Sequence, residues 1–169
     1  MLEIFNKLKP FFEDNYKRIS VREYARMQNI SPPNASQLLN NLEKEGLLKK
    51  EEDRRYHFFH AKRENLTFIK FQQIYYQRKL KDPIKYIEKE TINPIIILFG
   101  SFAKAEINEN SDIDLAIFTI TNKKLNLEKF EKKLNREIQV FTFKDRNKLN
   151  KNEELLNNIL NGVILSGSW

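Results

Sequence analysis

The chain has 169 residues, of which 40% are hydrophobic and 12% aromatic, enough to bury one ordinary core or two small ones. It contains no Cys and no strictly apolar run longer than five residues; this excludes disulfides and thiolate zinc sites, and we expect a cytoplasmic protein with no membrane partner. The net charge of +7 lies wholly in residues 1–81, which favours a polyanionic partner for the first half of the chain.

The first predicted motif is a pair of short helices joined by a tight turn. Ser20 and Glu23 form a capping-box pattern at the start of the first helix. Ser31 and Pro32 are typical of the N-cap and first position of a second helix, which we expect to end at Gly46. This spacing predicts a helix-turn-helix.

Two predicted strands and a longer helix follow. Residues 47–51 and 56–61 are predicted to form a β-hairpin, and its charged connection at residues 52–55 lacks an Asn-Gly turn and is expected to be loose. Residues 63–81 carry apolar side chains at helical spacing, and the Pro at position 83 favours an end to that helix. We therefore predict a winged helix-turn-helix domain with a connecting helix over residues 1–81.

The second helix of this motif is the predicted DNA reader. Its apolar stripe must face the domain core, so the opposite face is available to the major groove, where Gln and Asn can bond an adenine edge and Lys can reach guanine or phosphate. Basic side chains of the hairpin would lie over phosphate or the minor groove, although Glu51, Glu52 and Asp53 beside them oppose DNA. The predicted DNA-binding residues are Pro33, Gln37, Asn40 and Lys44 on the helix and Lys49, Arg54 and Arg55 on the hairpin.

Residues 15–62 resemble the winged helix-turn-helix domains of prokaryotic transcription regulators of the MarR and ArsR type. The resemblance is carried by residues 20–25 and 37–48. It implies double-stranded DNA as the partner and a homodimer, because such regulators usually read palindromes as dimers. RNA and protein stay open as alternative partners for this kind of module.

Helices and strands alternate in the predicted structure of residues 82–169. Helices are expected at residues 83–90, 102–107, 125–134 and 153–160, and strands at residues 95–99, 113–120, 138–143 and 163–165. Such alternation in so short a segment predicts a small mixed sheet with flanking helices. The whole chain is therefore placed in the α+β class, with an α/β-like second half and a domain boundary at residues 81 and 82.

Two pairs of residues in this second half point to phosphate chemistry. Gly100 and Ser101 follow an apolar strand, where a glycine lets phosphate approach the backbone and a hydroxyl lies beside free amides. Asp112 and Asp114 open the next strand and share one face of it. Carboxylates suit Mg²⁺, and in two-metal sites such ions hold a triphosphate and activate an attacking hydroxyl. The spacing predicts a site for Mg²⁺ and a nucleoside triphosphate, with ATP expected.

The same segment resembles the minimal nucleotidyltransferases of the DNA polymerase beta superfamily. The matching residues are 98–106 and 110–115, within a likeness that covers residues 84–165. It implies the nucleotidyltransferase fold. The phosphate-binding and catalytic metal-binding residues that it implies are Gly100, Ser101, Lys104, Asp112 and Asp114.

Some positions depart from the pattern of that family, which usually has Arg at Lys104 and Gly at Ala105. The larger departure is Gln139, which stands where the family has a third catalytic Asp. A Gln can ligate a metal through its carbonyl oxygen, but it supplies neither negative charge nor a proton acceptor. Glu137 lies two residues earlier on the same strand face, about 7 Å away, and is the candidate substitute for the third catalytic acid.

Three functions are compatible with this sequence. The first is a DNA-binding regulator whose second domain binds a nucleotide as a sensor or as an evolutionary remnant. The second is an active transferase that moves a nucleotidyl group to a protein, a small molecule or a nucleic-acid end. The third is a self-regulating antitoxin that modifies a partner toxin. The segregated charge favours DNA binding in all three.

Overall fold

The computed structural model describes residues 3–144 and 152–169, which fall into two compact units. Unit 1 consists of Met1–Gln72 together with Ala105–Glu109, and unit 2 consists of Gln73–Lys104 together with Asn110–Trp169. The chain therefore passes between the units three times. The predicted division at residues 81 and 82 has a single crossing and does not anticipate the short segment 105–109 in unit 1.

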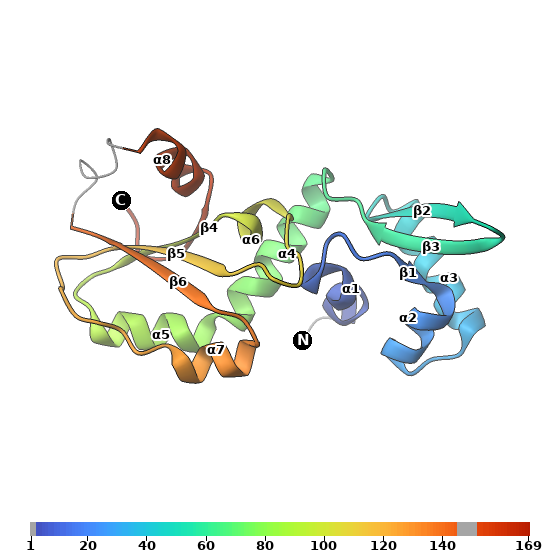
Figure 1. The fold of residues 1–169 in the computed structure, drawn as a ribbon, viewed down its shortest axis with the longest axis horizontal. Helices are drawn as coiled ribbons and strands as arrows, with labels where there is room; N and C mark the ends of the chain where they lie inside the picture. The colour runs from blue at the N-terminus through green and yellow to red at the C-terminus, as the bar shows by residue number, and fades with distance from the viewer. Residues whose placement is uncertain (1–2, 145–151) are drawn as a thin grey trace. The chain divides into compact units, whose positions relative to one another are not determined.

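Unit 1 begins with three helices, α1 (Glu3–Glu13), α2 (Val21–Gln28) and α3 (Pro32–Lys44) (Figure 1). The Ser20 hydroxyl accepts a hydrogen bond from the Glu23 amide at 3.2 Å, and the Ser31 hydroxyl accepts one from the Asn34 amide at 3.5 Å. Each cap satisfies an amide that has no partner within its own helix. The predicted helix-turn-helix is confirmed, and local capping explains where both helices begin.

A three-stranded sheet completes unit 1, in the order β1-β3-β2. Its strands are β1 (Ile19–Ser20), β2 (Leu48–Asp53) and β3 (Tyr56–Ala61), all antiparallel. Asp53 pairs with Tyr56, so the turn holds only Arg54 and Arg55, with φ of +46° and +71°. Two positive φ values in succession are typical of a type I′ turn. The expected loose connection is wrong, because two arginines adopt the left-handed conformation that Asn-Gly usually supplies.

The core of unit 1 is rich in aromatic side chains. Fully buried rings come from α1, α2, β3 and α4 (Leu66–Lys79), the last being the helix in which unit 1 gives way to unit 2. Edge-to-face and tilted ring pairs add to the burial of apolar area. The largest of these buried side chains are Phe5, Phe11, Phe12, Tyr24, Phe59 and Phe68.

Unit 2 is built on a four-stranded sheet in the order β6-β5-β4-β7. The β5 and β6 strands run parallel, and the other neighbours are antiparallel, so the sheet is mixed as predicted. Its elements are α5 (Lys81–Glu90), β4 (Ile95–Phe99), α6 (Ser101–Lys104), β5 (Ile113–Phe118), α7 (Glu128–Leu134), β6 (Ile138–Phe143), α8 (Glu153–Leu160) and β7 (Val163–Ser166).

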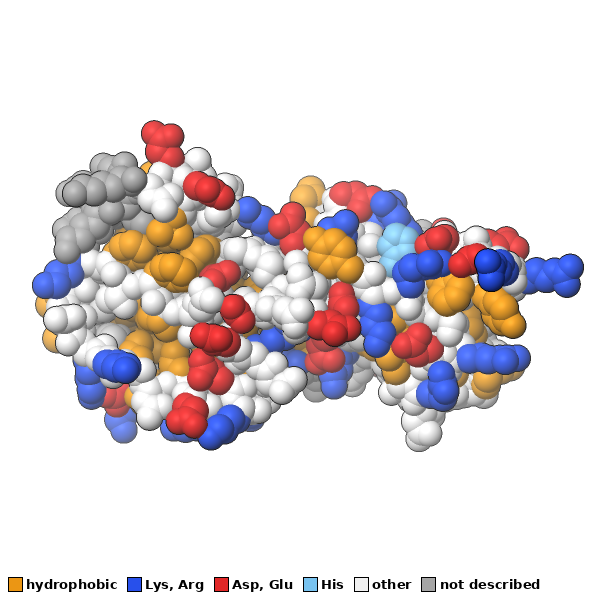
Figure 2. Space-filling model, in the orientation of Figure 1, with side chains coloured by type: hydrophobic (Ala, Val, Ile, Leu, Met, Phe, Trp, Pro, Cys, Tyr) orange, Lys and Arg blue, Asp and Glu red, His pale blue; other side chains and the backbone are white. Residues whose placement is uncertain are grey.

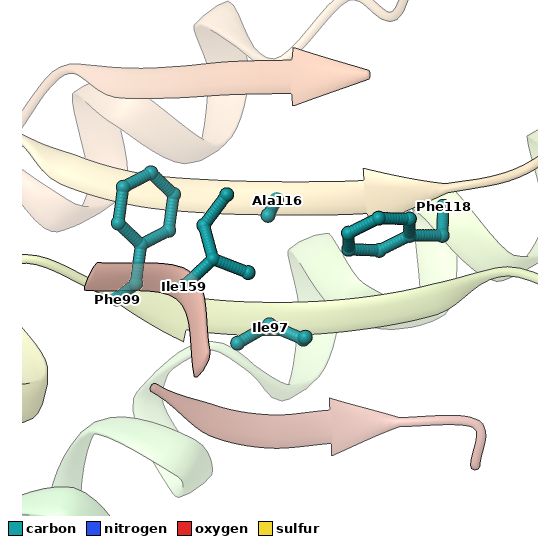
Figure 3. Close-up of a cluster of buried hydrophobic side chains, with 5 residues drawn as sticks. All are labelled: Ile97, Phe99, Ala116, Phe118 and Ile159. Carbon is teal, nitrogen blue, oxygen red and sulfur yellow. The ribbon is translucent and has the colours of Figure 1, made fainter. Parts of the chain in front are cut away.

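Both faces of this sheet are covered within unit 2. Helices α5 and α7 lie on one side, and α8 lies on the other (Figure 1). On the α8 side, alternate strand residues Ile97, Phe99, Ala116 and Phe118 pack with Ile159 of the helix (Figure 3). The same alternation places Asp114 on this face, in line with Ala116 and Phe118. None of the described helices is long and apolar enough to cross a membrane.

Candidate nucleotide site and nucleic-acid interface

Gly100 ends β4 in a conformation that favours glycine, with φ of +68°. A Cβ atom at this position would overlap the carboxylate of Asp114 on the neighbouring strand. Phe99 and Asp114 are paired across β4 and β5, so the turn after β4 lies directly beside this carboxylate. The glycine is therefore required both by the backbone turn and by the close approach of an acidic side chain.

Asp114 is half-buried, and its surroundings disfavour its charged form. Burial raises the pKa of its carboxyl group above the usual value, and the neighbouring charge of Asp112 raises it further. The charges of the two carboxylates repel each other, and a cation bound between them would relieve this repulsion. The pair thus has the electrostatic character of an anionic metal site.

Gln139 lies opposite Asp114 in the parallel pairing of β5 with β6. Its side-chain amide Nε2 donates a hydrogen bond of 2.8 Å to Oδ2 of Asp112. Among the described residues, no three His, Asp or Glu side chains form a group that could hold a metal ion. The backbone carbonyl of Glu137 accepts from the Ile113 amide at 2.9 Å, its side chain is exposed, and its role as a third acid stays a prediction.

The donor set fits one Mg²⁺ ion. Mg²⁺ in proteins is usually held by one or two carboxylates, with substrate phosphates and water completing the octahedron. Asp112 and Asp114 supply the carboxylates, and rotation of the Gln139 amide would present Oε1 in place of Nε2. The ion would neutralise the repulsion that raises the pKa of Asp114.

Besides Gly100, the residues predicted to bind phosphate in this turn region are Ser101 and Lys104. Ser101 is the first residue of α6 and is half-buried, and Lys104 is the last and is exposed. The Lys104 ammonium donates a 2.6 Å hydrogen bond to Oδ1 of Asn158 on α8. Ala105, where the resembling family usually has Gly, is fully buried with φ of +57°, a left-handed conformation that costs a non-glycine residue about 1 kcal/mol.

The predicted DNA-reading face of α3 is only partly open. Pro33, Gln37 and Lys44 are exposed. Asn40 is half-buried, and its amide donates to the carbonyl of Ser36 at 2.8 Å and accepts from the Lys50 ammonium at 3.3 Å. Asn40 must break these hydrogen bonds before its amide can bond a base. Gln37 is exposed and can bond a base without breaking those contacts.

The β2-β3 hairpin, which we call the wing, carries both signs of charge. Arg54 and Arg55 are exposed at its tip, and acidic side chains lie beside them (Figure 2). Lys49 is paired with Glu64 at 2.5 Å. Arg18, which sequence reasoning missed, is paired with Glu51 at 3.1 Å. Arg18 and Glu51 are 33 residues apart in the sequence, and no local sequence pattern predicts their contact.

Comparison with protein families agrees with both halves of this description. A family model described as polymerase beta, nucleotidyltransferase matches residues 81–167, and one described as winged helix-turn-helix DNA-binding matches residues 15–49. No curated protein matches the chain. The class of protein defined by fold and site is a winged helix-turn-helix fused to a nucleotidyltransferase domain. The chain belongs to the polymerase beta nucleotidyltransferase family.

Proposed function

We propose that the protein is a DNA-binding transcription regulator whose nucleotidyltransferase domain binds a nucleoside triphosphate, ATP being the first candidate, with Mg²⁺. The observation that carries this proposal is Gln139, which occupies the position opposite Asp114 and donates to Asp112. Two carboxylates suffice to hold one ion on a triphosphate. Activation of an attacking hydroxyl needs a further negative group or proton acceptor, which an amide does not supply.

The residues of the chain divide the work of binding. Gly100 lets the backbone turn pass close to the Asp114 carboxylate and keeps its own amide accessible to phosphate, Ser101 offers a hydroxyl donor, and Lys104 offers a positive charge. Asp112, Asp114 and the Gln139 oxygen would hold Mg²⁺, which when bound neutralises phosphate charge. The residue types and the close approach of Asp114 to Gly100 support these proposed roles.

Thermal unfolding with and without ATP and Mg²⁺ tests the nucleotide site. We expect the wild type to gain stability as ligand rises above its dissociation constant, by about 2.7 kcal/mol at a hundredfold excess. Asp112→Asn with Asp114→Asn should abolish the gain. The control is Asp82→Asn with Glu128→Gln, which removes two exposed carboxylates from α5 and α7. An unchanged gain in the first variant contradicts the site.

A titration of labelled duplex DNA at several salt concentrations tests the interface. Lys44→Ala and Arg55→Ala should each reduce the salt slope of binding by about 1, because each removes one phosphate contact. Lys9→Ala, on α1, is the matched control and should leave the slope unchanged. Wild-type binding that does not depend on salt would refute the interface. Light scattering of the same complexes tests whether the protein binds DNA as the homodimer that its resemblance to MarR- and ArsR-type regulators implies.

An active transferase is the second candidate function, and the retained pair Asp112 and Asp114 favours it. Such an enzyme would move a nucleotidyl group from the triphosphate to a protein or small molecule, with a partner toxin as one acceptor and Glu137 as the third catalytic acid. Incubation with base-labelled and α-phosphate-labelled ATP, Mg²⁺ and cell extract should then yield a labelled product. Absence of a labelled product with ATP and with the three other labelled nucleoside triphosphates would reject this candidate.

A further inference from the structure

The wing carries carboxylates at the place where it would approach phosphate. Glu51 pairs with Phe58 and Asp53 pairs with Tyr56, so these two acids lie on the same face of the sheet, next to the arginine turn. Carboxylates beside the phosphate backbone oppose binding by Arg54 and Arg55. A positive charge must therefore offset these two carboxylates if the wing is to contact DNA.

Arg18 lies across this acidic face. It precedes β1 at one edge of the sheet, and β1 and β2 lie on opposite sides of β3. Its Nε is 3.1 Å from Oε2 of Glu51 and its Nη2 is 3.5 Å from Oδ2 of Asp53. Its guanidinium carbon lies 4.7 Å from the centre of the Phe58 ring. One planar cation thus spans the middle strand, stacks on it and meets both acids.

The exposure of this cluster argues for a role other than stability. The side chains of Arg18, Glu51 and Asp53 are 44%, 47% and 50% exposed. Ion pairs this open contribute little to the free energy of unfolding. Their charge still acts at short range on a polyanion that approaches the same surface.

We propose that Arg18 is a positioning residue for DNA binding, which neutralises Glu51 and Asp53 and holds them away from the phosphates that Arg54 and Arg55 contact. This inference rests on the proposed DNA binding. It identifies Arg18 as the residue that allows the wing to approach DNA. Arg18 acts through the two acids and not through a phosphate contact of its own. This distinction can be measured.

A double-mutant cycle with labelled duplex DNA of mixed sequence tests the inference. Arg18→Ala should raise the dissociation constant about tenfold in the wild type. In a Glu51→Gln, Asp53→Asn background the same change should raise it less than about twofold, since the acids are gone. The net charge falls by one in both backgrounds, so bulk charge cannot produce the difference. An equal loss in both backgrounds overturns the inference.

Two further variants control for neighbouring charge and for folding. Lys17→Ala removes the adjacent cation, which pairs with Glu23 at 3.5 Å, and it should have the same small effect in both backgrounds. Arg18→Lys keeps the charge and should keep most of the affinity if neutralisation is the cause. Circular dichroism of each variant confirms the fold. Failure of the wild type to bind DNA rejects the proposed function as well, whereas normal wild-type binding with additive variants rejects only the role of Arg18.

Discussion

At the scale of single residues, Gln139 is the position on which the proposed function turns from nucleotide binding to catalysis. The Gln139 side chain has the same size and shape as that of Glu, and its amide already donates a hydrogen bond to Asp112. A carboxylate at this position would complete a set of three acids around the ion. The proposed chemistry of the site therefore depends on this one neutral side chain.

Gln139→Glu should convert the proposed nucleotide-binding site into a catalytic one. Without metal, the new carboxylate would repel Asp112, to which the Gln139 amide now donates a hydrogen bond. Because this contact is exposed, the free energy of unfolding should fall by about 1 kcal/mol. With Mg²⁺ the loss should be recovered, because the affinity for the ion rises. Transfer of labelled nucleotide should appear above the wild-type level. Gln37→Glu, an equal charge change on exposed α3, should produce none of these effects; identical metal dependence in both variants would contradict the prediction.

Asp114 gives the free protein a specific pH dependence. Its pKa is raised in the folded state by burial and then by Asp112, so the folded state binds more protons than the unfolded state between the two pKa values. Stability therefore falls as pH rises through the folded pKa, and the cost persists at neutral pH. Asp114→Asn should unfold at a higher temperature than the wild type at pH 7 without Mg²⁺. The difference should shrink as the solution is acidified.

The same measurement has an internal control of opposite sign. The pKa of Asp82 is lowered, first by its hydrogen bond with Lys133 and then by the charge of that lysine, so its contribution is present above the unfolded pKa and is lost on acidification. Asp82→Asn should give no gain in unfolding temperature at pH 7. A gain of equal size in both variants would show that Asp114 is not specially destabilised.

At the scale of elements, the residues where helices begin and the succession of strands along the chain were predictable, because both depend on neighbouring residues in the sequence. The capping serines fix where α2 and α3 begin, and the Gly100 turn follows from an apolar strand and a glycine. The wing turn was mispredicted, because the positive φ of Arg54 and Arg55 has no local signal. Contacts such as Gln139 with Asp112 arise only when strands pair, so the sequence could place the residues but not the hydrogen bond.

The wing turn predicts a conflict between stability and DNA binding. Non-glycine residues with positive φ cost about 1 kcal/mol each, and Asn-Gly suits a type I′ turn. Arg54→Asn with Arg55→Gly should therefore raise the free energy of unfolding by about 1–2 kcal/mol while weakening DNA binding. Urea unfolding and DNA titration measure the two effects. Lys7→Ala with Lys9→Ala removes the same charge from α1; equal losses of affinity would deny the turn a special role.

At the scale of the whole molecule, the segment Ala105–Glu109 joins the two parts of the nucleotide motif and belongs to unit 1. Asn15, which is 1% exposed, holds it there. The Ile107 amide donates to Oδ1 of Asn15 at 2.7 Å, and the Asn15 amide donates to the Ile107 carbonyl at 2.8 Å. The Asn15 side-chain nitrogen donates to Phe11 and Gln72. Every polar group of this side chain is thus used.

Asn15→Asp should loosen this segment while preserving shape. A carboxylate cannot donate, so the carbonyl oxygens of Phe11 and Gln72 lose their donor and a charge is buried; the free energy of unfolding should fall by about 3–5 kcal/mol. Residues 105–109 connect α6 to Asp112, and greater freedom there raises the entropy lost when Gly100 and Asp112 close on a triphosphate. The dissociation constant for ATP with Mg²⁺ should therefore rise, measured by calorimetry below the unfolding temperature.

Tyr24→Phe separates this effect from a general loss of stability. The Tyr24 hydroxyl donates to the Lys7 carbonyl at 2.8 Å in the same unit, a hydrogen bond that involves neither Asn15 nor residues 105–109. Its removal should lower the free energy of unfolding by about 1 kcal/mol and leave nucleotide affinity unchanged. If nucleotide affinity falls with stability in both variants, segment 105–109 has no special part in binding. If it falls only in Asn15→Asp, a residue of the DNA-binding unit sets the affinity of the nucleotide site, and by linkage the nucleotide must stabilise the conformation of that segment in return.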